Sequence, residues 1–198
     1  MAKRPPAWYW DACIFMAWLN AEDDVHGPAV MEGIREMVRD SDGGRAVVFT
    51  SVMTKTEIYH RLKTQWAKDE YNRFCQRPNT SVIAQDDRIG DKSSDIRAYY
   101  SRKGITLDAG DSIHLATAIL YEANVFYTLD GNADKPKPNA LLPLNGDVAG
   151  YPLRIQMPHA QQGSLFAGIP THVSSALKGP AAKTPLKVVA SNPHKRKR

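Results

Sequence analysis

Short apolar runs alternate with longer stretches of helical periodicity through most of this chain, and this alternation constrains the fold more than any other feature. Runs at 7–10, 46–49, 81–84 and 125–129 have the length and composition of strands. Between them, apolar residues recur every three or four positions, as they do on one face of a helix. Strands separated by helices form βαβ units, whose strands run parallel. We therefore predict an α/β fold with a central parallel sheet.

Four segments are predicted to form the main helices. The second of them can be capped by Thr50 or Ser51, because a hydroxyl accepts a hydrogen bond from a free backbone N–H. Its apolar stripe is predicted to be Ile58, Leu62 and Trp66, spaced four residues apart. The last segment has the clearest apolar face. In chain order, the four segments are about 30–42, 51–77, 86–102 and 111–123.

Composition divides the chain into one domain, residues 1–158, and a tail, residues 159–198. The alternation of strand and helix signals weakens after Asp130. The last candidates, 141–142 and 153–155, are predicted to be short edge strands. The tail is rich in Pro, Gly, Ser and Lys without sustained periodicity, so we expect it to be disordered. It holds seven of the 26 basic residues and no acidic one, which leaves 19 basic against 21 acidic residues in the domain. The net charge of +5 therefore comes from the tail.

The compartment is predicted from the cysteines and from the absence of export signals. Cys13 and Cys75 are too few for a disulfide framework, lie in helical segments and are expected to be buried thiols. The apolar run near the N-terminus is soon interrupted by Asp11, unlike a signal peptide. No stretch approaches the roughly 18 consecutive apolar residues that a membrane helix needs. We expect a cytoplasmic protein without a membrane segment.

Four acidic residues occupy positions where a sheet of this kind binds ligands. Asp11 and Asp130 each follow a predicted strand, and ligands of open parallel sheets bind outside the carboxyl ends of the strands. Glu57 lies about one helical turn beyond the second strand, and Asp111 begins the last helix. Asp111 could equally be a structural N-cap. The sequence thus predicts that four carboxylates converge at one edge of the sheet.

Clustered carboxylates indicate a metal site. Such groups repel one another and raise one another's pKa, unless a cation compensates them. Oxygen ligands without thiolates favour Mg²⁺ or Mn²⁺. Two such ions about 4 Å apart can activate a water and stabilise the leaving oxygen of a phosphodiester. Neither a histidine base nor a covalent nucleophile is then required.

The acidic motifs resemble, in order, those of PIN-domain nucleases, and most closely those of VapC-type toxins. The resemblance is carried by Asp11-Ala12, by the segment from Ser51 to Ile58 that contains Glu57, by Asp-Ser-Ile-His-Leu-Ala-Thr-Ala from Asp111, and by Thr-Leu-Asp ending at Asp130. It spans residues 9 to about 132, and the third motif is the most specific. The resemblance implies a three-layer α/β/α fold and cleavage of single-stranded RNA by metal-activated water. It also implies a homodimer and a cognate antitoxin that covers or distorts the acidic site.

The same resemblance assigns roles to individual side chains. Asp11, Glu57, Asp111 and Asp130 would be the catalytic and metal-binding acids. Hydroxyl groups would orient these carboxylates from a second layer of contacts. Further acids and amides near the site are left as alternatives, and Asp108 could supplement or replace Asp111. The supporting hydroxyls would be Ser51 or Thr54 and Thr128, and the further candidates are Asp108, Asn132 and Asp134.

Other interpretations are weaker but stay open. His60 and His114 follow Glu57 and Asp111 by three residues, as in di-iron helical bundles, but the intervening strands disfavour that fold. We expect packing or surface roles for both histidines, and His114 could contact RNA. The aromatic residues are predicted to pack in the core or a dimer contact rather than stack on bases. The basic end at 195–198 could bind phosphates or simply be solvated. Rival functions are a PIN-like module that binds RNA or protein without cleavage, and a DNA or structure-specific nuclease of the same fold.

Overall fold

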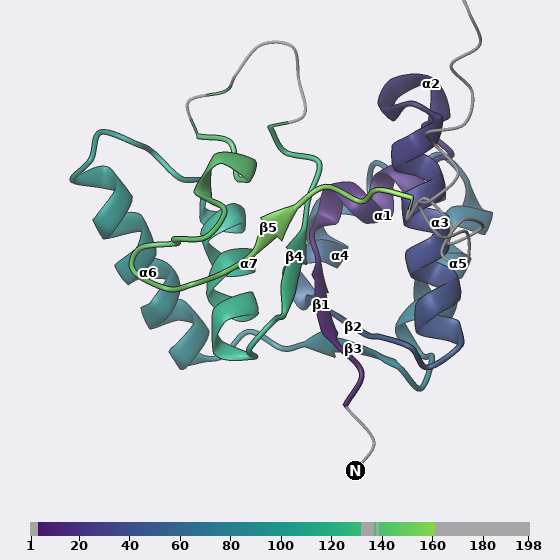
Figure 1. Ribbon diagram of the computed structural model, residues 1–198, viewed down its shortest axis with the longest axis horizontal. Helices are drawn as coiled ribbons and strands as arrows, with labels where there is room; N and C mark the ends of the chain where they lie inside the picture. The colour runs from purple at the N-terminus through teal and green to yellow at the C-terminus, as the bar shows by residue number, and fades with distance from the viewer. Residues whose placement is uncertain (1–3, 132–136, 138, 161–198) are drawn as a thin grey trace, which may run out of the picture. The chain divides into compact units, whose positions relative to one another are not determined.

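A parallel sheet of five strands organises the molecule (Figure 1). The computed structural model describes residues 4–131, 137 and 139–160. Each neighbouring pair of strands is parallel, in the order β3-β2-β1-β4-β5. On the central strand, Tyr9 lies level with Phe49 on one neighbour and Phe126 on the other. The strands are β1 (Ala7–Trp10), β2 (Val47–Ser51), β3 (Thr80–Ile83), β4 (Val125–Tyr127) and β5 (Ile155–Gln156).

Helices cover both faces of this sheet, so the fold has three layers. In Figure 1, α6 and α7 lie on one side of the strands, and α1, α3 and α5 lie on the other. The predicted three-layer α/β/α fold is therefore confirmed. The helices are α1 (Ala12–Leu19), α2 (Asp23–His26), α3 (Pro28–Asp42), α4 (Val52–Ile58), α5 (Gln65–Cys75), α6 (Asp87–Ser101) and α7 (Ala109–Leu120), with a 3-10 turn, η1, at Leu142–Leu144.

Two apolar cores follow from the alternation of side chains along the strands. Trp10 of β1 packs with residues of α1, α3 and α5, while the adjacent Tyr9 packs with residues of α6 and α7. Both side chains are fully buried, and Tyr9 stacks on Phe126 with ring centroids 4.9 Å apart. Burial on both faces explains why the strands read as continuous apolar runs rather than as alternating ones.

The prediction of a single helix over residues 51–77 is wrong. The chain forms α4, a turn, and then α5, which starts at a new cap where the Thr64 hydroxyl accepts from the Ala67 N–H at 3.1 Å. The Asn20 side chain accepts from the Lys63 N–H at 3.1 Å. A residue far away in sequence thus stabilises the turn between α4 and α5. Trp66 consequently leaves the predicted stripe and is 58% exposed.

The C-terminal elements also differ from the prediction. Residues 141–142 do not form a strand and lead into η1 instead, whereas the candidate at 153–155 is confirmed one or two residues later as β5. The last helix starts at Ala109 rather than Asp111 and ends at Leu120, which is 37% exposed. None of the described helices has the length and apolarity to cross a bilayer. The predicted tail, 159–198, lies almost wholly outside the described residues.

The observed position of α5 predicts that alanine substitution of two of its aromatic residues, Trp66 and Phe74, lowers the free energy of unfolding by different amounts. Because Phe74 is fully buried, Phe74→Ala should lower the free energy of unfolding by about 3 to 5 kcal/mol. Trp66→Ala should lower it by less than about 1 kcal/mol, since the side chain is mostly exposed. Urea unfolding of both variants checks this. If both variants lose the same free energy of unfolding, Trp66 contributes to the core as the predicted apolar stripe implied.

Candidate metal centre

The Asp11 carboxylate lies at the carboxyl end of β1 and is fixed by several donors. It caps α1 by accepting from the Ala12 N–H at 2.7 Å. Its other oxygen accepts from the Thr128 hydroxyl at 2.7 Å and from the Cys13 thiol at 3.1 Å. The residue is only 6% exposed. A buried carboxylate with this many donors has a single orientation.

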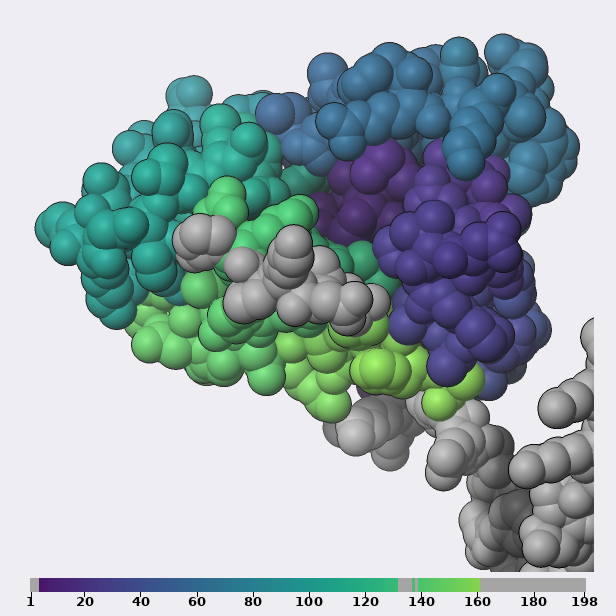
Figure 2. Space-filling model, turned by 90° about the horizontal axis from the view of Figure 1, so that it is seen from above, coloured from purple at the N-terminus to yellow at the C-terminus, as the bar shows by residue number. Residues whose placement is uncertain are grey.

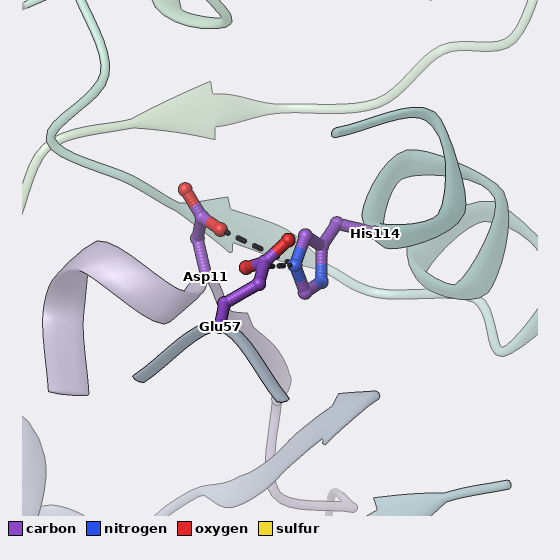
Figure 3. A group of neighbouring side chains, drawn as sticks. All are labelled: Asp11, Glu57 and His114. Carbon is purple, nitrogen blue, oxygen red and sulfur yellow. Dashed lines mark hydrogen bonds and ion pairs between the residues drawn. The ribbon is translucent and has the colours of Figure 1, made fainter. Parts of the chain in front are cut away.

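Glu57 of α4 and His114 of α7 meet beside Asp11 (Figure 3). His114 Nε2 lies 2.9 Å from Glu57 Oε2 and 3.8 Å from Asp11 Oδ1. One donor atom from each of the three residues lies within 4.8 Å of the others. Three elements that are distant in the sequence thus supply one compact group of potential metal ligands.

Tyr9 orients the His114 ring through Nδ1, the ring nitrogen that does not face Glu57. The Tyr9 hydroxyl lies 2.6 Å from His114 Nδ1 and accepts from the Ser51 N–H at 3.1 Å. In the neutral ring, a hydroxyl that donates to Nδ1 leaves the proton on Nε2, where it faces the Glu57 carboxylate. His114 is therefore a donor to Glu57 in this arrangement. It could bind a metal ion only by giving up that proton.

Electrostatics favour the charged form of this histidine. Burial alone would lower the pKa of His114, but the hydrogen bond to Glu57 and the negative charges of Asp11, Glu57 and Asp111 outweigh it and raise the pKa. The ring is 1% exposed. The neighbouring carboxylates therefore make the ring easier to protonate than its burial alone would allow.

The remaining predicted acids line the same cavity. Figure 2, which views the molecule from above the strands of Figure 1, shows a hollow where the teal, blue and purple segments meet. The cavity measures about 670 Å³. The five acids that line it are Asp11, Glu57, Asp108, Asp111 and Asp130.

Burial and neighbouring negative charges both raise the pKa of Asp111 in this cavity. Desolvation by burial, followed by the charges of Asp11, Asp130 and Asp108, raises its pKa to about 7, and His114 opposes this shift. A carboxyl group that is half protonated near neutral pH lacks a compensating cation. Asp111 is therefore the residue on which a bound cation would act most strongly.

Asp108 and Asp111 have different local roles. Asp108 is the N-cap of α7 and accepts from the Gly110 N–H at 2.6 Å, while Asp111 lies within the first turn. The alternative in which Asp111 caps the helix is therefore wrong. Asp108 is exposed, and one of its carboxylate oxygens already accepts from the backbone.

Asp130 lies at the rim of the cavity. One oxygen accepts from the Leu141 N–H at 3.0 Å, and the other forms an ion pair with Lys137 at 3.3 Å. This carboxylate is thus oriented by the segment that follows β4. The other two rim candidates, Asn132 and Asp134, lie outside the described residues.

The predicted supporting hydroxyls divide into two kinds. Thr128 donates to Asp11, as predicted for a group that orients a carboxylate. Ser51 instead caps α4 by accepting from the Met53 N–H at 3.2 Å. The Thr54 hydroxyl lies 2.6 Å from the Thr50 hydroxyl. In the described part of the chain, no hydrogen bond joins the Ser51 or Thr54 side chain to one of the acids.

The sequence interpretation did not place His114 or Cys13 beside the acids, where the structure has both. A histidine three residues after Asp111 lies one helical turn further along the same helix, and that spacing could have placed it beside the acids. Cys13 was expected to be merely buried, but its sulfur contacts Asp11 and accepts from the Leu129 N–H at 3.1 Å. It joins the ends of β1 and β4.

A comparison with family models matches residues 9–137 to the PIN domain. The chain belongs to the PIN-domain family. The matched range contains all four predicted acids and His114. No curated protein matches the chain in a sequence search.

Solved structures of VapBC proteins share this fold. VapBC2 from Rickettsia felis bound to a promoter DNA fragment matches with a TM-score of 0.51 at 13% identity, over 68% of this chain and 96% of that chain. DNA-bound VapBC from Salmonella typhimurium matches with a TM-score of 0.50 at 18% identity, over 76% of this chain and 97% of that chain. At these identities the likeness concerns the fold alone.

The donor set fits a hard divalent cation. Carboxylate oxygens dominate the cavity, and a cation among them would lower the raised pKa of Asp111. Asp11 and Glu57 each turn a carboxylate oxygen toward the shared centre with His114. This group could hold a metal ion.

Removal of the Asp111 charge should stabilise the metal-free protein. Because the folded pKa of about 7 exceeds the ordinary 3.8, the charged form costs stability as pH rises from about 4 to 7 and above. Asp111→Asn should therefore raise the free energy of unfolding at pH 8 by about 1 to 2 kcal/mol after solvent screening, and little at pH 4.

Urea unfolding in a chelator at both pH values measures this effect. Asp24→Asn, at an exposed acid of α2, is the matched control and should change little. A loss of stability at pH 8 in Asp111→Asn would contradict the assignment of repulsion.

Proposed function

We propose that this PIN-domain protein is a Mg²⁺- or Mn²⁺-dependent endoribonuclease that hydrolyses RNA phosphodiester bonds. The observation that carries the proposal is the convergence of Asp11, Glu57 and His114 within 4.8 Å, in a cavity that Asp111 and Asp130 also line. Asp11, Glu57, Asp111 and Asp130 would be the metal-binding and catalytic acids. When bound, the cation would supply charge neutralisation and Lewis-acid activation of a water and a phosphate oxygen.

The chain's own residues would prepare this site before substrate arrives. Thr128 and the backbone of Ala12 hold both oxygens of Asp11 in place. His114 directs Glu57 by donating from Nε2. Fixed carboxylates need no reorganisation when charge develops at the phosphate, and such preorganisation is a large part of catalysis in enclosed sites.

We further propose that the protein is the toxin of a toxin–antitoxin pair. The fold it shares with VapBC structures from two bacteria supports this class of function. A cognate antitoxin would cover the acidic cavity, and the active form would be a homodimer. The protein would act in the cytoplasm, where its RNA substrate is found.

Neutralising one acid tests the proposed chemistry. Asp11→Asn should lower RNA cleavage in Mn²⁺ by at least about 100-fold, because several kcal/mol of stabilisation at the cation would be lost. Asp24→Asn is the matched control and should cleave normally. Gel assays on labelled single-stranded RNA, single-stranded DNA and flap substrates measure the rates.

Three outcomes would overturn parts of the proposal. Normal cleavage by Asp11→Asn would remove the site assignment. Cleavage confined to DNA or to flaps would replace the ribonuclease with a different nuclease of this fold. Absence of both cleavage and a Mn²⁺-dependent thermal shift in the unmodified protein would leave a binding module.

Gly110 offers a second test that leaves every acid in place. A Cβ at this position would collide with the Glu57 carboxylate, so Gly110→Ala should displace Glu57 from His114. We expect the affinity for Mn²⁺ to fall about 10-fold or more, the loss that is typical when an oriented ligand is disturbed. Isothermal titration with Mn²⁺ measures the affinity.

Gly90→Ala is the matched control for this variant. Gly90 is also helical, but a Cβ there meets nothing within 4 Å. Its Mn²⁺ affinity should be unchanged. If both variants bind Mn²⁺ like the unmodified protein, the position of Glu57 is irrelevant to the metal.

A further inference from the structure

A second cavity lies near the amino ends of the strands and extends along β4 and β5 to their last residues, Tyr127 and Gln156. It measures about 750 Å³ and is lined mainly by residues that precede strands. Arg4 comes before β1, Arg45 before β2, Asn124 before β4 and Arg154 before β5. In Figure 1 this is the end at which the chain begins. This cavity and the acidic cavity share no lining residue.

The charge of this cavity is opposite to that of the acidic one. Three arginines line it, and none of its lining residues is acidic. Arg45 is fixed by an ion pair with Asp40 at 2.7 Å. Arg4 and Arg154 are exposed, and neither has an ion pair or a side-chain hydrogen bond within the described part of the chain. Two guanidinium groups with unused donors favour an anion that accepts several hydrogen bonds, such as a phosphate.

Aromatic side chains form another wall of the same cavity. Trp8 and Tyr127 contact edge to face, with ring centroids 5.6 Å apart. Tyr127 is buried and its hydroxyl accepts from Gln156 at 3.1 Å, so the pair is held in place, while Trp8 is half-buried. A partly exposed indole beside arginines suits a planar base, because aromatic and guanidinium faces both stack on nucleobases.

We propose that this cavity binds a nucleotide unit, with its phosphate on Arg4 and Arg154 and its base against Trp8. The volume lies within the range of pockets that take small ligands, about 300 to 1,000 Å³. The unit could belong to an RNA strand or to a free nucleotide, since both present a phosphate and a base. The proposal concerns binding alone and does not depend on cleavage at the acidic cavity.

Charge reversal of one free arginine tests the site. Arg154→Glu should weaken binding of a labelled single-stranded RNA decamer at least about 10-fold at low salt and reduce the salt slope by about one. Fluorescence anisotropy measures both quantities, and the chelator together with the Asp11→Asn background minimises cleavage during the measurement. Arg97→Glu, at an exposed arginine of α6, is the matched control and should have a smaller effect. Thermal unfolding confirms that both variants fold.

Competition then identifies the source of the nucleotide. If adenosine monophosphate displaces the decamer and binds as tightly, the cavity is a site for free nucleotides. If the decamer binds far more tightly, the cavity is part of an RNA-binding surface. Both results support the proposal, and either can occur whether or not the protein cleaves RNA.

Three results would overturn it. Equal RNA affinity in Arg154→Glu and Arg97→Glu would show that the cavity does not contact nucleotides. Competition by inorganic phosphate as strong as by adenosine monophosphate would leave an anion site without base recognition. If Arg154→Glu instead loses binding to an acidic peptide used as a second probe, while it still binds RNA normally, the cavity would be a site for a protein partner.

Discussion

The hydrogen bonds that hold the Asp11 carboxylate are the interaction on which the rest of the site depends. A carboxylate 6% exposed is costly to bury unless donors surround it, and here a helix N-terminus, a hydroxyl and a thiol supply them. These donors come from the ends of two adjacent strands, β1 and β4. The same contacts that satisfy the charge therefore align the strand ends, so the fold and the acidic cavity share one origin.

The other acids are placed around this fixed point by contrasting environments. Glu57 is held by the charge-assisted contact with His114, and Asp130 is held by a backbone N–H and a lysine. Asp111 lacks such a partner among the described residues, and its pKa rises accordingly. The cavity thus combines oriented carboxylates with one group whose charge is poorly compensated. That combination is characteristic of functional sites, because folding stability alone would not select it.

The acids that follow strands were the part of this site that the sequence predicted most directly. Asp11 and Asp130 follow apolar runs, and the geometry of parallel sheets then requires both to lie at one edge. His114 could not be recognised in the same way, because its role depends on Tyr9, which lies 105 residues away in the sequence. The break between α4 and α5 was also hidden, since no glycine or proline marks it and the tertiary contact of Asn20 maintains it. Local patterns predict elements, whereas contacts between distant segments decide such details.

The position of Cys13 has a consequence for the chemical durability of the protein. Burial first, and then the negative charge of Asp11, raise the pKa of this thiol well above its ordinary value. Oxidants and alkylating reagents attack the thiolate, which is scarce under these conditions. The carboxylate that organises the cavity thereby also lowers the thiolate fraction of the sulfur beside it, which should slow the reaction of this strand junction with peroxide.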